Sequence, residues 1–193
     1  AARLQKRVES LIAKGYAADR ASQVLRNAGI ASALVSLGGS SIRAIGTPPG
    51  RNGWPIFIRD PRDGERPAAW LELHDGEALG TSGTYENTVG EGNERKSHII
   101  NPATRAALGG ALSVTVLSRQ AETADALTKF FLLQGFTTTA DRAKWLARFP
   151  KASMMLMAVR QGTLMKTAAG DQPQRFRSLE PGHQDRTHAA KTN

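Results

Sequence analysis

Three short segments of this sequence carry side chains that can do chemistry. In chain order they contain Lys14 with Gly15, then His98, then Asp125. A lysine beside a flexible glycine can bind a phosphate, a neutral histidine can accept a proton from a hydroxyl, and an aspartate can hold Mg²⁺. Each also has an ordinary alternative: a surface lysine, a surface histidine bonded to a turn, and a carboxylate at the positive end of a helix dipole.

The composition limits the classes of partner. The chain has 193 residues, enough for one substantial core, and carries 26 Lys and Arg against 17 Asp and Glu, a net charge of +9. The basic residues are scattered, so a solvated basic surface is the first interpretation and a polyphosphate ligand the second. We expect no specific nucleic-acid binding and no transmembrane segment, because no basic aromatic platform and no long apolar run is present.

The absence of cysteine limits the chemistry further. With no cysteine in the sequence, a disulfide, a thiolate metal site and a cysteine nucleophile are excluded. Cysteine usage does not choose between the cytoplasm and the exterior of the cell envelope. The compartment therefore stays unassigned from the sequence.

The elements that must position these residues follow from hydrophobic periodicity and turn signals. Helical patterns cover residues 3–27, 122–133 and 140–149, with Thr139 as the expected N-cap of the last. Short strands are predicted at 33–37, 42–46, 54–59, 68–73, 78–81, 96–100, 111–118, 154–159 and 163–166. The fold class is therefore α+β, with mostly antiparallel short strands and three to four helices. We expect one domain over residues 1–167 and a disordered polar tail over 168–193.

A series of motifs in a fixed order carries a family resemblance. The series is Ile12-Ala13-Lys14-Gly15-Tyr16-Ala17-Ala18-Asp19, Leu37-Gly38-Gly39-Ser40-Ser41-Ile42-Arg43, Thr81-Ser82-Gly83-Thr84-Tyr85-Glu86, Ser97-His98-Ile99-Ile100-Asn101-Pro102 and Ala124-Asp125-Ala126-Leu127. It resembles the FAD:protein FMN transferase (ApbE-like) family over roughly residues 8–167. The resemblance implies that this chain corresponds to the C-terminal portion of such a protein.

The resemblance implies an activity and a set of roles. The expected reaction is Mg²⁺-dependent cleavage of FAD, transfer of FMN to a serine or threonine of an acceptor protein, and release of AMP. His98 is the implied base, and Lys14 and Ile100 are implied contacts to FAD. The implied metal ligands are Asp125, the backbone carbonyl near Leu11, and Thr128. The alternative is a non-catalytic remnant or interaction module that binds flavin weakly.

One departure from the family pattern bears on the metal. The family has a metal-binding threonine one turn after the aspartate, and that position is Lys129 here, with Thr128 one residue before it. An ammonium at that point either occupies the place of the cation or repels it.

Overall fold

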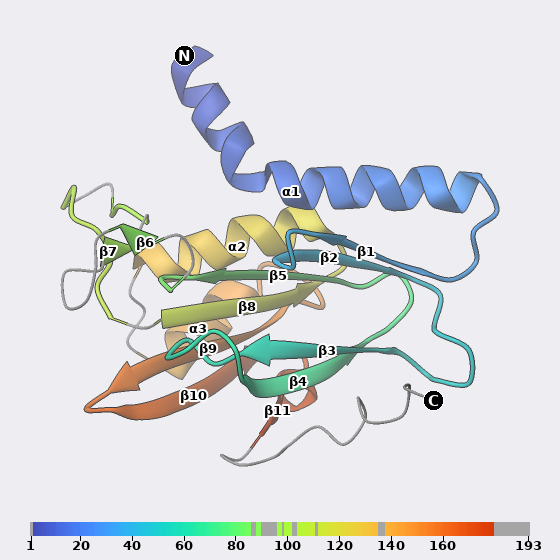
Figure 1. Cartoon of the computed structure of the whole chain (residues 1–193). Coiled ribbons are helices and arrows are strands. Elements are labelled where there is room, and N and C mark those ends of the chain that lie inside the picture. Colours follow the sequence, from blue (N-terminus) through green and yellow to red (C-terminus); the bar gives the residue numbers. More distant parts are fainter. Residues whose placement is uncertain are drawn as a thin grey trace.

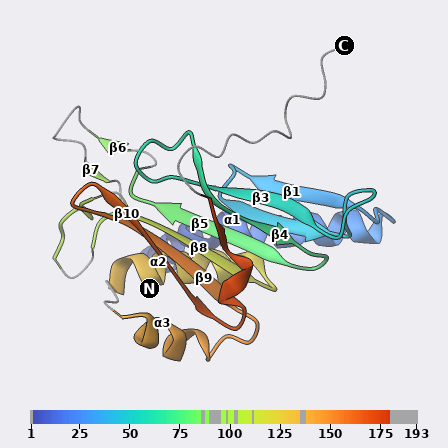
Figure 2. The ribbon, with the colours of Figure 1, turned by 90° about the horizontal axis from the view of Figure 1, so that it is seen from below.

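One six-stranded antiparallel sheet forms the centre of the computed structural model. The structure describes residues 2–85, 88–89, 96–97, 99–101, 104–110, 112–134 and 138–179, and of residues 2–11, 88–89 and 96 it describes the backbone. The strands of the large sheet are, in order, β1 (Ala33–Leu37), β2 (Ser41–Ile45), β5 (Ala78–Gly83), β8 (Leu112–Ser118), β9 (Ser153–Arg160) and β10 (Thr163–Gly170). Figure 2 shows β5, β8, β9 and β10 side by side in this order.

Two smaller sheets complete the strand pairing. The three-stranded sheet has the order β11 (Arg177–Ser178), β4 (Pro67–Leu73) and β3 (Trp54–Arg59). The two-stranded sheet pairs β6 (Thr88–Val89) with β7 (Lys96–Ser97). Neighbouring strands pair antiparallel in all three sheets. The expected α+β class with mostly antiparallel strands is confirmed.

Helices cover one face of the large sheet and the three-stranded sheet covers the other. The helices are α1 (Ala2–Asn27), α2 (Ala121–Gln134) and α3 (Thr139–Leu146), followed near the C-terminal end by the short 3₁₀ helix η2 (Pro173–Arg175). Figure 1 shows α1 and α2 above the large sheet, with β3 and β4 below it. In the part of the chain that the structure describes, none of the helices is long and apolar enough to cross a membrane.

Alternating side chains of the large sheet fill a core on each side. Toward β3 and β4, buried residues from both sheets pack together: Ile42, Ala44, Ile56, Ile58, Ala69, Leu71, Leu73, Leu79, Leu117, Met155 and Met157. Toward the helices, the buried cluster contains Val114, Val116, Ala124, Leu127, Phe131, Leu132, Leu146 and Met154. Val116 and Leu117 of β8 thus face opposite sides, as the period of two in a strand requires. The large sheet is therefore the middle of three layers.

The helix starts differ from the predicted ones by one residue. α2 begins at Ala121, so Asp125 lies in the second turn of the helix, and Glu122 is the acidic residue of the first turn. For α3 the predicted cap, Thr139, is wrong. Thr138 is the cap because its extended backbone (φ −114°, ψ 152°) lets its hydroxyl accept from the Asp141 N–H at 3.1 Å.

The strand predicted over residues 96–100 is shorter in the structure. β7 ends at Ser97, and Ile100 makes an isolated bridge to Ala107. The physical reason is a turn directly after it, in which the Arg105 N–H donates to the Asn101 carbonyl at 2.8 Å. The chain therefore folds back on itself here instead of extending the sheet.

The domain continues beyond the boundary expected at residue 167. β10 extends to Gly170, η2 follows, and β11 pairs with β4. Phe176, 6% exposed, packs in the core between the sheets, which anchors this segment. The expectation of a disordered tail is therefore wrong for residues 168–179, while 180–193 lie outside the described residues.

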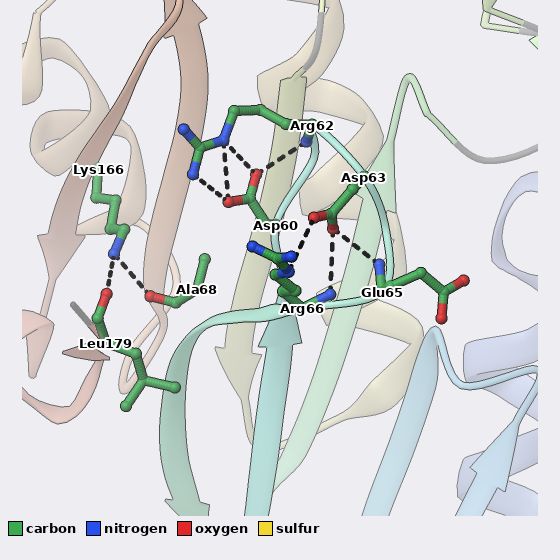
Figure 3. A network of polar contacts seen from close by, with 8 residues as sticks. All are labelled: Asp60, Arg62, Asp63, Glu65, Arg66, Ala68, Lys166 and Leu179. Atoms are coloured by element: carbon green, nitrogen blue, oxygen red, sulfur yellow. Dashed lines mark hydrogen bonds and ion pairs between the residues drawn. The ribbon is translucent and has the colours of Figure 1, made fainter. Parts of the chain in front are cut away.

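A lysine ties the C-terminal segment to β4. The Lys166 ammonium donates to the carbonyl oxygens of Ala68 and Leu179, at 2.7 and 2.8 Å (Figure 3). In the neighbouring turn, the Arg62 guanidinium donates to both carboxylate oxygens of Asp60. The Lys166 contacts join β10 of the large sheet to the three-stranded sheet, and the Asp60–Arg62 contacts order the turn after β3.

Candidate functional site

Asp125 is a buried carboxylate held by two other elements. Its side chain lies on α2 and the residue is 1% exposed. The Gly15 N–H of α1 donates to Oδ2 at 2.8 Å, and the Ser41 hydroxyl at the start of β2 donates to Oδ1 at 2.7 Å. Hydrogen bonds from both sides compensate part of the cost of burying this group. The carboxylate is therefore fixed in position by α1 and β2.

Two glycines let the surrounding elements come close enough to make these bonds. A Cβ at Gly15 would lie 2.3 Å from the Ala121 carbonyl oxygen of α2. A Cβ at Gly80 of β5 would lie 2.8 Å from the backbone carbonyl carbon of Ala124. No side chain fits at either contact, so α2 lies directly against both α1 and β5. This packing places Asp125 between them.

Asp19, one turn after Gly15, fixes the start of α2. Its two carboxylate oxygens accept from the backbone N–H groups of Ala121 and Glu122, both at 3.0 Å. Asp19 thus caps α2 from another helix, satisfying two N–H groups that a helix start leaves open. Arg43 lies 3.4 Å from Asp19, and burial lowers the pKa of its guanidinium while Asp19 opposes that change.

Thr128 and Ser82 form a second buried polar contact beside Asp125. The Thr128 hydroxyl donates to the backbone carbonyl of Asp125 at 2.8 Å, and lies 2.8 Å from the Ser82 hydroxyl of β5. Thr128 is fully buried and Ser82 is 8% exposed. The hydroxyl is therefore engaged in binding α2 to β5.

The ammonium of Lys129 faces the same carboxylate. Lys129 stands four residues after Asp125 on α2, where side chains of a helix meet, and its Nζ lies 3.7 Å from Oδ1. Its side chain is 21% exposed, against 1% for Asp125. The buried carboxylate therefore has a positive charge beside it.

Lys14 adds a second ammonium next to this cluster. Its Nζ donates to the Ser40 hydroxyl, and Ser40 precedes the Ser41 that binds Asp125. The turn between β1 and β2, with Gly38 and Gly39, passes along the Lys14 side chain. Lys14, Ser40, Ser41, Asp125 and Lys129 thus form one continuous group, called here the Asp125 cluster. One carboxylate and two ammonium groups give it a positive balance suited to an anion.

Within the Asp125 cluster, the Asp125 carboxylate is the group whose chemistry fits a metal cation. A carboxylate offers about four lone-pair directions, and each Asp125 oxygen is used once by a hydrogen bond. Mg²⁺ is commonly held by one or two carboxylates with water and phosphate oxygens filling its shell. Among the described side chains, no three His, Asp or Glu residues gather into a metal-binding group. An ion would therefore rely on Asp125 and share it with Lys129.

The expected site residues differ in whether the structure describes them and in whether they lie near Asp125. His98 lies outside the described residues, between Ser97 and Ile99, which are joined by a 3.0 Å bond from the Ile99 N–H to the Ser97 hydroxyl. Ile100 is 52% exposed, on the turn that returns to Ala107. Leu11 belongs to α1, and its side chain lies outside the described residues. Lys14, Asp125 and Thr128 are brought into one region of the fold.

Sequence reasoning did not identify the side chains that hold α2 and its Asp125 in place. Ser41, Ser82 and Asp19 contact α2 from positions that are remote in the sequence. The run Gly38-Gly39-Ser40-Ser41 contained a signal, because its small residues allow a close backbone approach. The capping role of Asp19 had no local signal, since its partners are 102 and 103 residues away.

Comparisons with known proteins identify relatives. An FAD:protein FMN transferase of Rhodobacter capsulatus is 39% identical over 123 residues, which are 64% of this chain and 23% of that protein. Another, of Klebsiella pneumoniae (strain 342), is 30% identical over 163 residues, covering 82% of this chain and 44% of that protein. The chain spans less than half the length of these curated relatives.

Solved structures give the same picture. The ApbE protein of Thermotoga maritima superposes with a TM-score of 0.70 at 29% identity, over 83% of this chain and 50% of that chain. The flavin transferase ApbE of Vibrio cholerae gives a TM-score of 0.65 at 28% identity, over 83% of this chain and 49% of that chain. The model of the ApbE family matches residues 10–155, most of this chain. The chain therefore belongs to the ApbE family.

Proposed function

We propose that this chain acts in an FAD:protein FMN transferase, which cleaves FAD and transfers FMN to a serine or threonine of an acceptor protein with release of AMP. The observation that carries the proposal is the buried Asp125 held between α1, β2 and α2, with Lys14 and Lys129 beside it. Transfer of a phosphoryl group depends mainly on positioning and on positive charge around the phosphates. The named relatives that carry this activity support the assignment.

The reaction requires one bond to form and one to break. The oxygen of the acceptor hydroxyl forms a bond to the phosphorus of the FMN moiety, and the bond from that phosphorus to the bridging oxygen of the pyrophosphate breaks. AMP leaves with the bridging oxygen. We assign His98 as the group that takes the hydroxyl proton and passes it to water, since a histidine titrates near neutral pH.

The described residues supply charge and position for this step. We expect Lys14, whose ammonium donates to the Ser40 hydroxyl, to bind a phosphate oxygen of FAD. The exposed Ile100 is the expected apolar contact to FAD. Mg²⁺ would bind at Asp125 only in competition with the Lys129 ammonium, and its further expected ligands are the backbone carbonyl near Leu11 and the Thr128 hydroxyl. When bound, the ion supplies positive charge to the pyrophosphate as negative charge develops on it.

The test uses the whole chain with FAD, Mg²⁺ and a peptide that bears an acceptor threonine. We expect AMP release and a peptide heavier by one FMN moiety, measured by mass spectrometry. Asp125→Asn removes the charge of the buried carboxylate and should abolish both products. Glu65→Gln, in the exposed β3–β4 turn, removes one carboxylate outside the site and should leave both products unchanged. If FAD stays intact with the unchanged chain, the proposed activity is wrong for this chain.

The second candidate is a module that binds flavin without transfer, and measuring FAD binding together with AMP release separates it from the first. Lys129 favours this candidate, because an ammonium at 3.7 Å competes with an ion at Asp125. Quenching of FAD fluorescence by the chain without AMP release would identify it. Binding together with AMP release would exclude it.

A further inference from the structure

Lys129 has a position that the reaction above leaves unexplained. Its ammonium lies 3.7 Å from Oδ1 of Asp125, the same oxygen that accepts from the Ser41 hydroxyl, while Oδ2 accepts from the Gly15 N–H. A carboxylate that is 1% exposed is costly to keep ionised unless a cation or hydrogen-bond donors compensate it. Lys129 is the cation that the chain itself supplies.

A divalent ion at Asp125 would meet this ammonium at close range. Mg²⁺ binds carboxylate oxygens at about 2.0–2.1 Å, so an ion bound to Oδ1 would lie close to the Lys129 ammonium, which is 3.7 Å from the same oxygen. Two cations this close repel each other strongly, since Asp125 is shielded from water. The four-carbon stem of lysine is flexible, and the 21% exposure of the side chain leaves a direction in which it can move away.

The neighbouring charges strengthen this effect. Lys14 is joined to the Asp125 cluster through Ser40, so the cluster holds two ammonium groups and one carboxylate before any ion binds. A divalent ion would add to the repulsion between the Lys14 and Lys129 ammonium groups, whereas the negative charges of a diphosphate would reduce it. The charge balance of the Asp125 cluster therefore favours binding of an anion over binding of a divalent cation.

We propose that Lys129 is a tethered cation that takes the place of a divalent metal at Asp125. Magnesium reaches the carboxylate only by displacing the ammonium, and the chain binds the diphosphate of FAD in the absence of a divalent ion. The second statement rests on the proposed function, because it names FAD as the ligand. The first rests only on the geometry of Lys129 and Asp125.

The metal arm of the test compares four proteins: the unchanged chain, Lys129→Met, Lys129→Arg and the control Lys144→Met. Lys144 is an exposed lysine of α3, so its replacement removes one positive charge elsewhere. Binding of Mn²⁺ is followed by the loss of the electron paramagnetic resonance signal of the free ion, and binding of Mg²⁺ by calorimetry. We expect Lys129→Met to bind both ions about tenfold tighter or more, and the other two variants to match the unchanged chain.

Melting temperatures measured in EDTA and in Mg²⁺ show whether each variant is folded and whether it binds the ion. Lys129→Met leaves Asp125 without its ammonium, so its melting temperature should fall in EDTA and rise again with Mg²⁺. The melting temperature of the unchanged chain should respond little to Mg²⁺. Equal ion binding by Lys129→Met and the unchanged chain, with no rescue of melting, would overturn the inference.

The ligand arm follows FAD fluorescence in EDTA and in Mg²⁺. The unchanged chain should bind FAD in EDTA, whereas Lys129→Met should lose about tenfold or more in EDTA and recover with Mg²⁺. FAD binding that requires Mg²⁺ equally in both proteins would overturn the anion part of the proposal. If no protein binds FAD while the metal arm behaves as expected, the proposed function is wrong and the competition at Asp125 stands.

Discussion

The backbone N–H of Gly15 on α1 donates a 2.8 Å hydrogen bond to Oδ2 of Asp125 on α2, across 110 residues of sequence. The bond exists because no side chain separates the two helices at this point. A Cβ at Gly15 would lie 2.3 Å from the carbonyl oxygen of Ala121. The position of the buried carboxylate therefore depends on a missing side chain in another helix.

Gly15→Ala should move α1 away from α2 and lower the free energy of unfolding by about 1–3 kcal/mol, the usual cost of overpacking. Urea denaturation followed by circular dichroism measures this change. The control is Ala17→Ser on the exposed side of α1, for which we expect a change within about 0.5 kcal/mol. Identical denaturation curves for the two variants would contradict the close packing of the helices.

Asp19→Ala should destabilise the protein because it removes the cap of α2. The Ala121 and Glu122 N–H groups would lose their acceptors, and the loss of a helix cap costs about 0.5–2 kcal/mol. Thermal melting measures the change against Asp171→Ala, an exposed carboxylate after β10. A melting temperature for Asp19→Ala equal to that of the control would show that the cap contributes nothing.

Thr128→Val should lower the free energy of unfolding by about 1–3 kcal/mol, because the Ser82 hydroxyl then loses its buried partner. Valine keeps the shape of threonine, so packing changes little. A double-mutant cycle with Ser82→Ala isolates the contact, and a coupling of about 0.5–1.5 kcal/mol is expected. Additive effects of the two replacements would mean that the hydroxyls do not interact.

The Glu77–Arg175 pair should make stability depend on acid pH. Arg175 Nη1 and Nη2 donate to the two Glu77 oxygens at 2.6 and 2.8 Å. Burial raises the pKa of Glu77, but hydrogen bonds and charge from Arg175 and His74 outweigh it and hold this pKa below its ordinary value of 4.5. The contribution is therefore complete above pH 4.5 and is lost as the pH falls through the lower folded-state pKa.

Urea denaturation at several pH values checks this dependence. Glu77→Gln should be less stable than the unchanged chain at neutral pH, and the difference should shrink on acidification. Glu65→Gln, in an exposed turn, should show the same pH profile as the unchanged chain. A difference for Glu77→Gln that stays constant down to acid pH would contradict the lowered pKa.

Local patterns in the sequence predicted the strands well and their ends less well. β1 and β3 were predicted at the bounds the structure shows, because apolar runs between turns define them. β10 and β11 extend the fold to Leu179, since Phe176 is buried between the sheets in a segment that is otherwise polar. A single buried aromatic residue gives no periodic signal in a sequence.

The residues of the Asp125 cluster differ in how clearly the sequence indicates them, and their functional roles stay predictions. Lys14, Asp125 and Lys129 stand out by residue type, and the structure brings them to one cluster. Ser41 and Ser82 are ordinary in the sequence, and only strand register places their hydroxyls against α2. The helix predicted from residue 122 begins at Ala121 instead, because Asp19 caps it there.

Asp19 and Gly15 lie one helical turn apart on α1, and both bind α2. Asp19 accepts from the first N–H groups of α2, and the Gly15 N–H donates to the Asp125 carboxylate, so the orientation of this carboxylate depends on how α2 begins. A sliding of α1 along its axis would break both holds together, so the two helices open as one cooperative unit. The amide hydrogens of Gly15, Ala121 and Glu122 should therefore exchange with solvent in a single opening event, which hydrogen exchange by nuclear magnetic resonance can follow. The contacts that position the Asp125 carboxylate are therefore also contacts that hold α1 and α2 together.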